Sequence, residues 1–158
     1  MKTSRAIDAI KAAGHDISDE YSRKECIDFL NTAIHAVSGL LIAAHSPMMV
    51  REILIHDGES VPVHYVRAAG QYPLRMTGQT VHFVDPMMNE IRFRYFATMS
   101  PLDDETGDLP FPHDALNTYV LKVAILHALN RNEYDIAQDK ALADEFCAIL
   151  TGAVTGNG

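Results

Sequence analysis

Apolar residues in the N-terminal part recur at alternating steps of three and four positions, the spacing that places side chains on one face of an α-helix. These positions are Ile27, Leu30, Ile34, Val37, Leu41 and Ala44. Pro47 ends the pattern, because proline has no N–H group to donate inside a helix. Residues 1–46 are therefore expected to be helical, with one long amphipathic helix that ends before Pro47.

Polar residues indicate where the helices of this segment begin. Ser22 and Glu25 match a capping box, in which each side chain accepts a hydrogen bond from the other residue's backbone N–H. Ser4 is a candidate N-cap for a short earlier helix that Gly14 stops. The segment is therefore expected to contain two helices.

From residue 51 to residue 97 apolar positions alternate with polar ones, as in strands with one buried face. The expected strands are Arg51–His56, Tyr72–Met76, Thr80–Asp85 and Glu90–Ala97. Asp57-Gly58 is expected to turn the first strand into a hairpin, because glycine tolerates the positive φ of a tight turn. A second turn is expected at Thr77-Gly78-Gln79.

The last of these strands has two chemically different faces. Ile91, Phe93 and Tyr95 lie on one side, which is expected to be buried. Arg92 and Arg94 lie on the other side, which meets either water or a partner. These two arginines are therefore candidate interface residues.

Residues 98–113 form an acidic linker with three prolines and no Lys or Arg. A connection of this length without secondary structure is usually functional or mobile. Its carboxylates lack the alternating ligand spacing of an EF-hand calcium loop. The two remaining alternatives are a solvated loop and a contact with a partner. The candidate interface residues here are Asp103, Asp104 and Glu105.

The C-terminal part is expected to form two more helices. The first begins near Asp114, a candidate N-cap, and ends near Leu129. It carries Leu116, Tyr119, Val120, Val123 and His127 on one side. The second helix covers about Glu133–Leu150. Residues 151–158 contain three glycines and are expected to be flexible until a partner binds them.

These patterns predict an α+β fold in a single domain of 158 residues. A helical bundle from residues 1–46 and 114–150 carries an inserted small antiparallel β-sheet or hairpin from residues 51–97. The linker 98–113 and the flexible tail 151–158 complete the chain.

Charge and hydropathy narrow the classes of partner. Thirteen basic and twenty-one acidic residues give a net charge of −8, which disfavours recognition of duplex nucleic acid. No apolar run approaches the roughly 20 residues of a membrane span, and charges near the N-terminus interrupt any secretion signal. Synthesis in the cytoplasm and no membrane contact are expected.

Motifs that carry catalytic chemistry are not found in the sequence. It contains no nucleophile elbow and no glycine-rich phosphate loop. His64, His82 and Asp85 are the best candidates for a metal site, on loose spacing that favours ordinary hydrogen bonding instead. Cys26 and Cys147 are expected to be buried thiols. No cofactor and no enzymatic activity are expected.

Two methionine doublets fall in predicted loops or turns, where little core is available to them. They are Met48-Met49 and Met87-Met88. Methionine adapts to irregular surfaces, so the doublets either fill gaps between helices and sheet or contact a partner. We take all four as candidate interface residues.

The order of elements and several local strings resemble the adaptor proteins of bacteriophage head–tail connectors, including the tail-tubular A-like proteins of short-tailed phages. The strings are GESVPVHYVRAAGQYPLRMTGQTVHFVDP, EIRFRYFATMSPL and, after an acidic loop, LPFPHDALNTYVLKVAILHALNRNEYDIAQDKALADEF. The similarity covers about Ile27 to Leu150.

The resemblance implies a structural protein of the virion neck that forms a ring, commonly of twelve copies. Its partners would be other copies of itself, the portal protein and a downstream tail protein, and genomic DNA would pass through the ring without sequence-specific binding. In such adaptors a C-terminal segment typically contacts the portal. The corresponding candidates are Leu150, Thr151, Ala153 and Val154.

Three alternatives remain open at this point. The chain could be another ring-forming neck component, such as a stopper or terminator. It could be a small metal-dependent enzyme built on His64, His82 and Asp85. It could also be a prophage module that binds a host protein through the methionine doublets.

Overall fold

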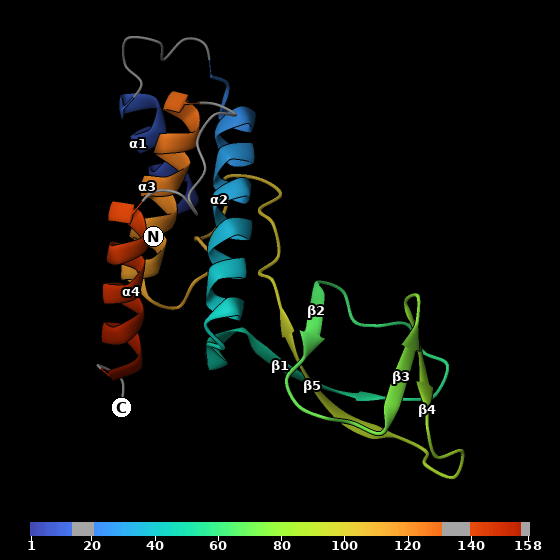
Figure 1. Cartoon of the computed structure of the whole chain (residues 1–158). Coiled ribbons are helices and arrows are strands. Elements are labelled where there is room, and N and C mark those ends of the chain that lie inside the picture. Colours follow the sequence, from blue (N-terminus) through green and yellow to red (C-terminus); the bar gives the residue numbers. More distant parts are fainter. Residues whose placement is uncertain (14–20, 131–139, 156–158) are drawn as a thin grey trace. The chain divides into compact units, whose positions relative to one another are not determined.

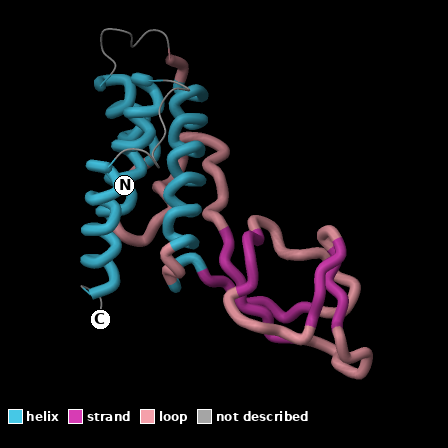
Figure 2. The backbone as a smooth tube through the Cα atoms, viewed as in Figure 1, coloured by secondary structure: helices cyan, strands magenta, loops and turns pink. Residues whose placement is uncertain are grey.

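The computed structural model describes residues 1–13, 21–130 and 140–155, in which helices flank a group of short antiparallel strands (Figures 1 and 2). The chain divides into two compact units. Met1–Val37 and Pro101–Gly158 form the helical unit, and Ser38–Ser100 form the β unit. The β unit is thus inserted between the two halves of the helical unit. The predicted α+β class, with helices at both ends and an inserted antiparallel sheet, is confirmed.

The helical unit contains α1 (Thr3–Ala13), α3 (Asp114–Asn130), α4 (Lys140–Thr155) and most of α2 (Arg23–Ala43). In this unit α3 packs against both α1 and α4 (Figure 1). Its buried side chains include Ala6, Ile7, Ile10, Leu30, Ile34, Leu116, Tyr119, Val120, Val123 and Phe146. The Tyr119 hydroxyl donates a hydrogen bond to the Leu142 carbonyl over 3.1 Å, which ties α3 to α4.

The start of α2 has the predicted capping box. The Glu25 N–H donates to Ser22 Oγ over 3.2 Å, and the Ser22 N–H donates to a Glu25 carboxylate oxygen over 3.3 Å. The buried stripe of the helix is also close to the prediction, since Leu30, Ile34 and Val37 are each at most 1% exposed. The helix ends at Ala43, before Pro47 as expected, which leaves Ala44 exposed.

The start of α1 differs from the prediction. The helix begins at Thr3, so Ser4 lies inside its first turn and is not the N-cap. A contact distant in sequence sets this start: the Thr3 N–H donates to the Gly107 carbonyl over 3.1 Å, and the Leu109 N–H donates to the Met1 carbonyl over 2.9 Å. The N-terminus therefore pairs with the acidic linker before the helix begins.

The C-terminal helices also differ in detail from the prediction. Asp114 is the first residue of α3 instead of its N-cap, since the Leu116 and Asn117 N–H groups both donate to the His113 carbonyl. Helix α4 continues to Thr155, so residues 151–155, expected to be flexible, are helical. The predicted start of this helix near Glu133 lies outside the described residues.

The β unit contains five strands in two sheets. They are β1 (Val50–Ile55), β2 (Tyr65–Ala68), β3 (Leu74–Thr77), β4 (Thr80–Phe83) and β5 (Ile91–Ala97). One sheet has the order β1-β5-β2, and the other is the hairpin β3-β4, with the predicted turn at Gly78. A single cluster of apolar side chains joins the two sheets: Ile55, Val81, Phe83, Ile91, Phe93, Tyr95 and Ala97.

Two predictions in the β unit were wrong. Asp57-Gly58 is a turn with Gly58 at φ 84°, but β1 does not form a hairpin with the chain that follows. β1 pairs instead with the distant β5, with Ile53 opposite Phe93. Strand β2 was not predicted, and it occupies the other side of β5. Both errors concern pairings between segments far apart in sequence, which a local pattern does not specify.

Candidate interaction surfaces

The outer face of the β1-β5-β2 sheet carries the two candidate arginines. Alternation along β5 places Arg92 and Arg94 opposite the buried aromatic side, and their side chains are 74% and 58% exposed. Glu52 of β1 lies directly across from Arg94, and Leu54 lies across from Arg92. One Glu52 carboxylate oxygen lies 3.5 Å from Arg92 Nε, and the other lies 3.9 Å from Arg94 Nε. Glu52 could not be identified from the sequence, because its place beside the arginines depends on strand register.

One end of the same face is covered. Phe96 is only 6% exposed. The Arg67 guanidinium lies 4.9 Å from the centre of the Phe96 ring and donates a hydrogen bond over 2.9 Å to the Ile42 carbonyl near the end of α2. Glu52, Leu54, Arg92 and Arg94 are exposed on the rest of this face, and we call this group of four the arginine face.

The methionine doublets each place one side chain inward. Met49 is 1% exposed, whereas Met48 is only partly buried. Met88 packs against the core of the β unit, and Met87 is 85% exposed. The gap-filling interpretation is therefore right for Met49 and Met88, and Met87 is the one member of the four that is fully displayed to solvent.

The turn that displays Met87 is held by its own backbone and by Asp85. The Met87 N–H donates to Asp85 Oδ1 over 2.9 Å, and the Met88 N–H donates to the Asp85 carbonyl over 3.2 Å. Pro86 fixes one φ angle of the turn. Asp85 therefore has a local structural role in this turn.

The acidic linker is anchored to the helical unit at several points. The Asn31 side chain donates to the Leu102 carbonyl over 2.9 Å and accepts from the Leu102 N–H over 2.7 Å. Glu105 pairs with Arg23, and this contact raises the pKa of the arginine. Leu109 and Phe111 are buried. The linker is therefore anchored to the unit at several points, while Asp103, Asp104 and Asp108 between these points are exposed to solvent.

The candidate carboxylates of the linker have different surroundings. Glu105 is engaged by Arg23. Asp104 accepts hydrogen bonds from the side chain and the N–H of Thr106, which lower its pKa. Asp103 is exposed and has no hydrogen bond or ion pair among the described residues. Asp103 and Asp104 therefore remain available on the surface.

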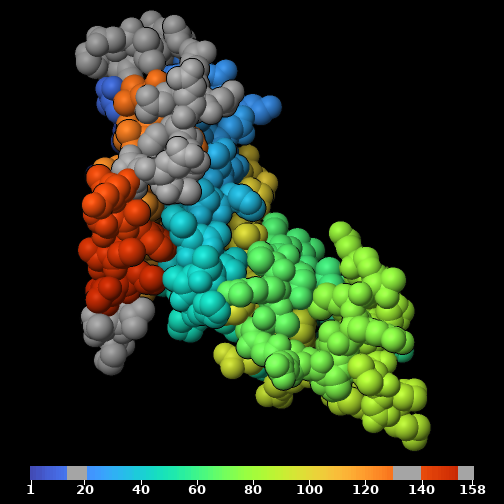
Figure 3. Space-filling model, viewed as in Figure 1, coloured from blue at the N-terminus to red at the C-terminus, as the bar shows by residue number. Residues whose placement is uncertain are grey.

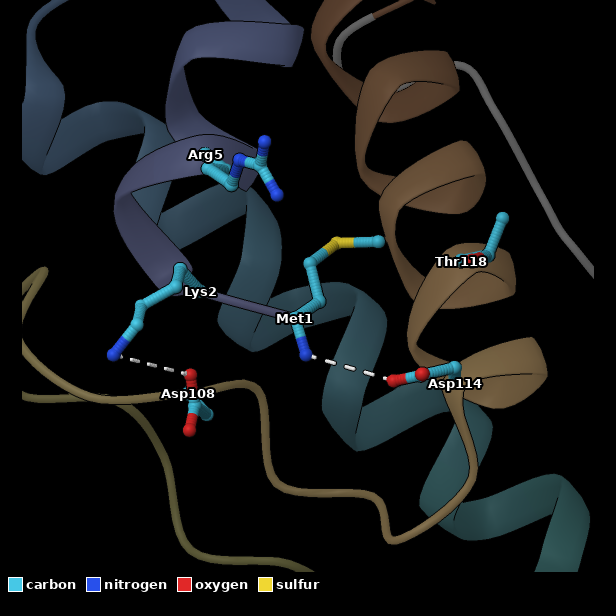
Figure 4. A pocket seen from close by; sticks show the side chains of 6 residues that line it. All are labelled: Met1, Lys2, Arg5, Asp108, Asp114 and Thr118. Carbon is cyan, nitrogen blue, oxygen red and sulfur yellow. Dashed lines mark ion pairs between the residues drawn. The ribbon is translucent and has the colours of Figure 1, made fainter.

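A polar pocket of about 440 Å³ lies at the N-terminus of α1 (Figure 4). Its lining residues are Met1, Lys2, Arg5, Asp108, Asp114 and Thr118. The Met1 amino group lies 3.7 Å from Asp114, and Lys2 Nζ lies 3.9 Å from Asp108. Both carboxylates thus face amines of the same chain, and the pocket is nearly balanced in charge.

The portal-docking candidates lie at the end of α4. Leu150 is partly buried, and Thr151 is exposed and donates to the Cys147 carbonyl over 2.9 Å. Ala153 and Val154 belong to the helix, but their side chains lie outside the described residues. In Figure 3 the helix, drawn in red, is at the surface, in line with its exposed Lys140, Ala143, Asp144 and Ala148.

The two cysteines differ from each other. Cys26 is fully buried as expected, and burial raises the pKa of its thiol. Cys147 is exposed on α4, so the prediction that it is buried was wrong. The reason is that Leu142 and Phe146 supply the buried side of this helix, and Cys147 lies next to them on the outside.

No group of three or more His, Cys, Asp and Glu residues within 1–13, 21–130 and 140–155 is arranged to hold a metal ion. His64, His82 and Asp85 are thus not brought together. His64 adopts a positive φ of 65° in the loop before β2. His127 of α3 lies within the helical unit, where burial lowers its pKa.

By length and composition alone, one helix of the described part of the chain, α2, could cross a membrane. Core helices of proteins without any membrane contact pass the same test. The buried stripe of α2 is that of a core helix.

The net charge of the protein resides in one unit. Ser38–Ser100 contain five arginines, no lysine and five carboxylate residues, so the β unit is neutral. The helical segments carry the remaining eight basic and sixteen acidic residues, and with them the net charge of −8.

Comparison of the sequence with protein-family models and with curated proteins found no match.

Proposed function

We propose that this protein is an adaptor of a bacteriophage head–tail connector, which forms a ring, joins the portal of the DNA-filled head to the tail and extends the DNA exit channel. The observation that carries the proposal is the insertion of a β unit between two pairs of helices. This is the order of elements expected from the resemblance. The strings that resemble adaptors include β2 to β5, both ends of the acidic linker, α3 and the first part of α4.

The distribution of surface chemistry supports a ring. In a cyclic head-to-tail assembly every subunit needs two different and complementary patches. The protein offers an arginine face on the β unit and exposed carboxylates on the helical unit. Both are exposed on the described part of a single chain.

The charge of the protein also suits a conduit for DNA. A lumen that attracted phosphates would retain the genome when it is released. The net charge of −8 disfavours such retention. On this proposal the protein is made in the host cytoplasm and is located in the neck of the virion.

Co-assembly with the portal protein of the same phage tests the proposal. The expected result is a ring on the portal, seen by electron microscopy and counted by native mass spectrometry. A pull-down with purified portal distinguishes an adaptor from a stopper or terminator, because only the adaptor is expected to touch the portal directly. A chain that stays monomeric and unbound when portal is present would contradict the proposal.

A pair of leucine variants tests the portal-docking end of α4. Leu150→Ala is expected to weaken portal capture. Leu129→Ala is the matched control, because Leu129 is 47% exposed on α3 and lies outside the candidate segment. Equal capture by both variants would rule out Leu150 as a portal contact, and a thermal melt of each variant confirms that it is folded.

A further inference from the structure

The arginine face has unused binding capacity. Glu52 lies beside the Nε atom of both Arg92 and Arg94, at 3.5 and 3.9 Å. Within the described ranges neither guanidinium forms a hydrogen bond, and Glu52 is the carboxylate that pairs with both of them. One carboxylate is thus shared by two guanidinium groups, which leaves one surplus positive charge. Leu54, 52% exposed, adds an apolar contact next to it.

The chemistry of this face favours a carboxylate partner. Glu52 lies beside the Nε atom of each guanidinium without a hydrogen bond to it, and the two Nη groups of a guanidinium can bind a further carboxylate through parallel hydrogen bonds. A nucleic acid backbone fits less well, because Glu52 would lie close to every phosphate bound there. The ligand expected here is therefore a pair of adjacent protein carboxylates.

The chain itself carries such a pair in the acidic linker. Asp103 and Asp104 are adjacent and exposed. The segment is held in place next to them by the two hydrogen bonds between Asn31 and Leu102. A segment that is already ordered loses little conformational entropy when it binds. The neighbouring Glu105 is already paired with Arg23 and is not needed.

We propose that the arginine face of one copy binds Asp103 and Asp104 of the next copy, and that this contact sets the register of the ring. The contact rests on the proposed function in one respect, the closed head-to-tail assembly. Because the helical unit carries the net charge of −8, contacts between two helical units are disfavoured, and the neutral β unit is the more favourable neighbour.

A charge-swap experiment tests the contact on the purified protein alone. The first variant is Arg92→Glu with Arg94→Glu, and the second is Asp103→Arg with Asp104→Arg. Each variant alone opposes like charges, so the concentration for half-assembly is expected to rise at least about tenfold. A one-to-one mixture restores opposite charges at every contact and is expected to assemble near the wild-type concentration, with the two chains alternating by native mass spectrometry.

The mixture also distinguishes contacts between copies from contacts within one chain. If the arginine face met the acidic linker of its own chain, mixing the two variants would restore nothing. Because Asp104 also accepts hydrogen bonds from Thr106, Asp103→Arg alone is a second variant that leaves this turn intact. Asp103→Arg alone is also expected to raise the concentration for half-assembly. Mixing it with the Arg92 and Arg94 variant is expected to recover part of the loss.

A control with the same change in net charge uses other arginines of the β unit. Arg51 and Arg75 are exposed on β1 and β3 and have no ion pair with any described residue. Arg51→Glu with Arg75→Glu is expected to change the assembly concentration by less than about threefold, since long-range charge effects are screened by salt. A loss equal to that of the Arg92 and Arg94 variant would overturn the specific contact.

The possible results distinguish a failure of this contact from a failure of the proposed adaptor function. Wild-type protein that remains monomeric up to the highest soluble concentration, or a mixture that fails to recover, overturns the contact and leaves the portal experiment to decide the function. Assembly that follows the charge-swap pattern without any binding to portal supports the contact and overturns the adaptor role.

Discussion

The two units differ in how they use their charged side chains. In the helical unit, Arg23 binds Glu105 and Asp8, and Lys122 binds Glu145, so charged groups join segments of the unit to one another. In the β unit, Glu52 pairs with both Arg92 and Arg94, and neither guanidinium forms a hydrogen bond in the described part of the chain. Net charge alone therefore does not locate a binding surface. The neutral unit still presents two exposed arginines that share one carboxylate.

The two units also differ in how their cores are built. The helical core depends on packing between helices from both ends of the chain. The β core is a single cluster within 63 consecutive residues, Ser38–Ser100. Substitutions in one core are therefore expected to act first on that unit, and the following predictions test this difference.

The largest expected effect comes from Phe93→Ala in the β unit. Phe93 is fully buried and contacts the rings of Tyr65, Tyr72 and Tyr95. Its loss is expected to lower the free energy of unfolding by about 3–5 kcal/mol. Urea unfolding measures the loss, and hydrogen exchange is expected to increase first in β1 and β5.

The control for this substitution is Val63→Ala, at a residue that is 77% exposed. Its effect is expected to stay within about 0.5 kcal/mol. If Phe93→Ala costs under about 1 kcal/mol, or increases exchange first in α3, the β core is not the independent cluster described above.

A smaller loss is expected when the acidic linker is released from the helical unit. Asn117 is buried, and its side chain bonds to both the N–H and the carbonyl of Phe111. Asn117→Ala leaves both backbone groups unpaired, with an expected cost of about 1–3 kcal/mol. Hydrogen exchange in residues 101–113 is expected to increase.

Asn89→Ala is the matched control, because Asn89 is an exposed amide in the loop between β4 and β5. It is expected to leave both stability and exchange in the linker unchanged. If Asn117→Ala also leaves exchange in residues 101–113 unchanged, the linker is held by its other contacts.

The sequence predicted the elements whose cause is local. The capping box of Ser22 and Glu25, the alternation of β5 and the turn at Gly78 all depend on residues within a few positions of each other. Elements with a distant cause were missed. Strand β2 has only four residues and forms on β5 about 30 positions later.

Among the candidate interface residues, too, those placed by a local pattern were predicted and those placed by distant contacts were missed. Arg92 and Arg94 were identified because alternation alone places them outside. Glu52 was missed because only the register between β1 and β5 brings it to them. Likewise, nothing in the composition of the acidic linker indicates that Asn31 and Arg23 hold it.

The Met87-Met88 doublet allows a comparison between two adjacent positions. Met88 packs against the β core, whereas Met87 is 85% exposed. Met88→Ala is expected to cost about 1–2 kcal/mol, and Met87→Ala less than about 0.5 kcal/mol. Thermal or urea unfolding of the two variants checks the difference. Equal losses would mean that both side chains contribute to packing, and Met87 would no longer be a displayed residue.

The smallest effects are expected from two carboxylates, one in each unit, whose pKa values are lowered by local hydrogen bonds. The His56 N–H and imidazole lower the pKa of Glu59, and the hydroxyl and N–H of Thr106 lower that of Asp104. A lowered pKa in the folded state stabilises the fold above the unfolded-state pKa, and this contribution is lost as the pH falls through the folded-state value. Glu59→Gln and Asp104→Asn keep an acceptor oxygen but remove the titration.

Each variant is therefore expected to lose less stability than the wild type does between about pH 5 and pH 3. The measurement is the urea midpoint as a function of pH, with hydrogen exchange to locate the change in the β unit for Glu59→Gln and in the acidic linker for Asp104→Asn. Because both carboxylates lie at the surface, about 0.5 M salt is expected to reduce the difference. A variant whose pH profile coincides with that of the wild type would show that its local hydrogen bonds do not depend on the charge of the carboxylate.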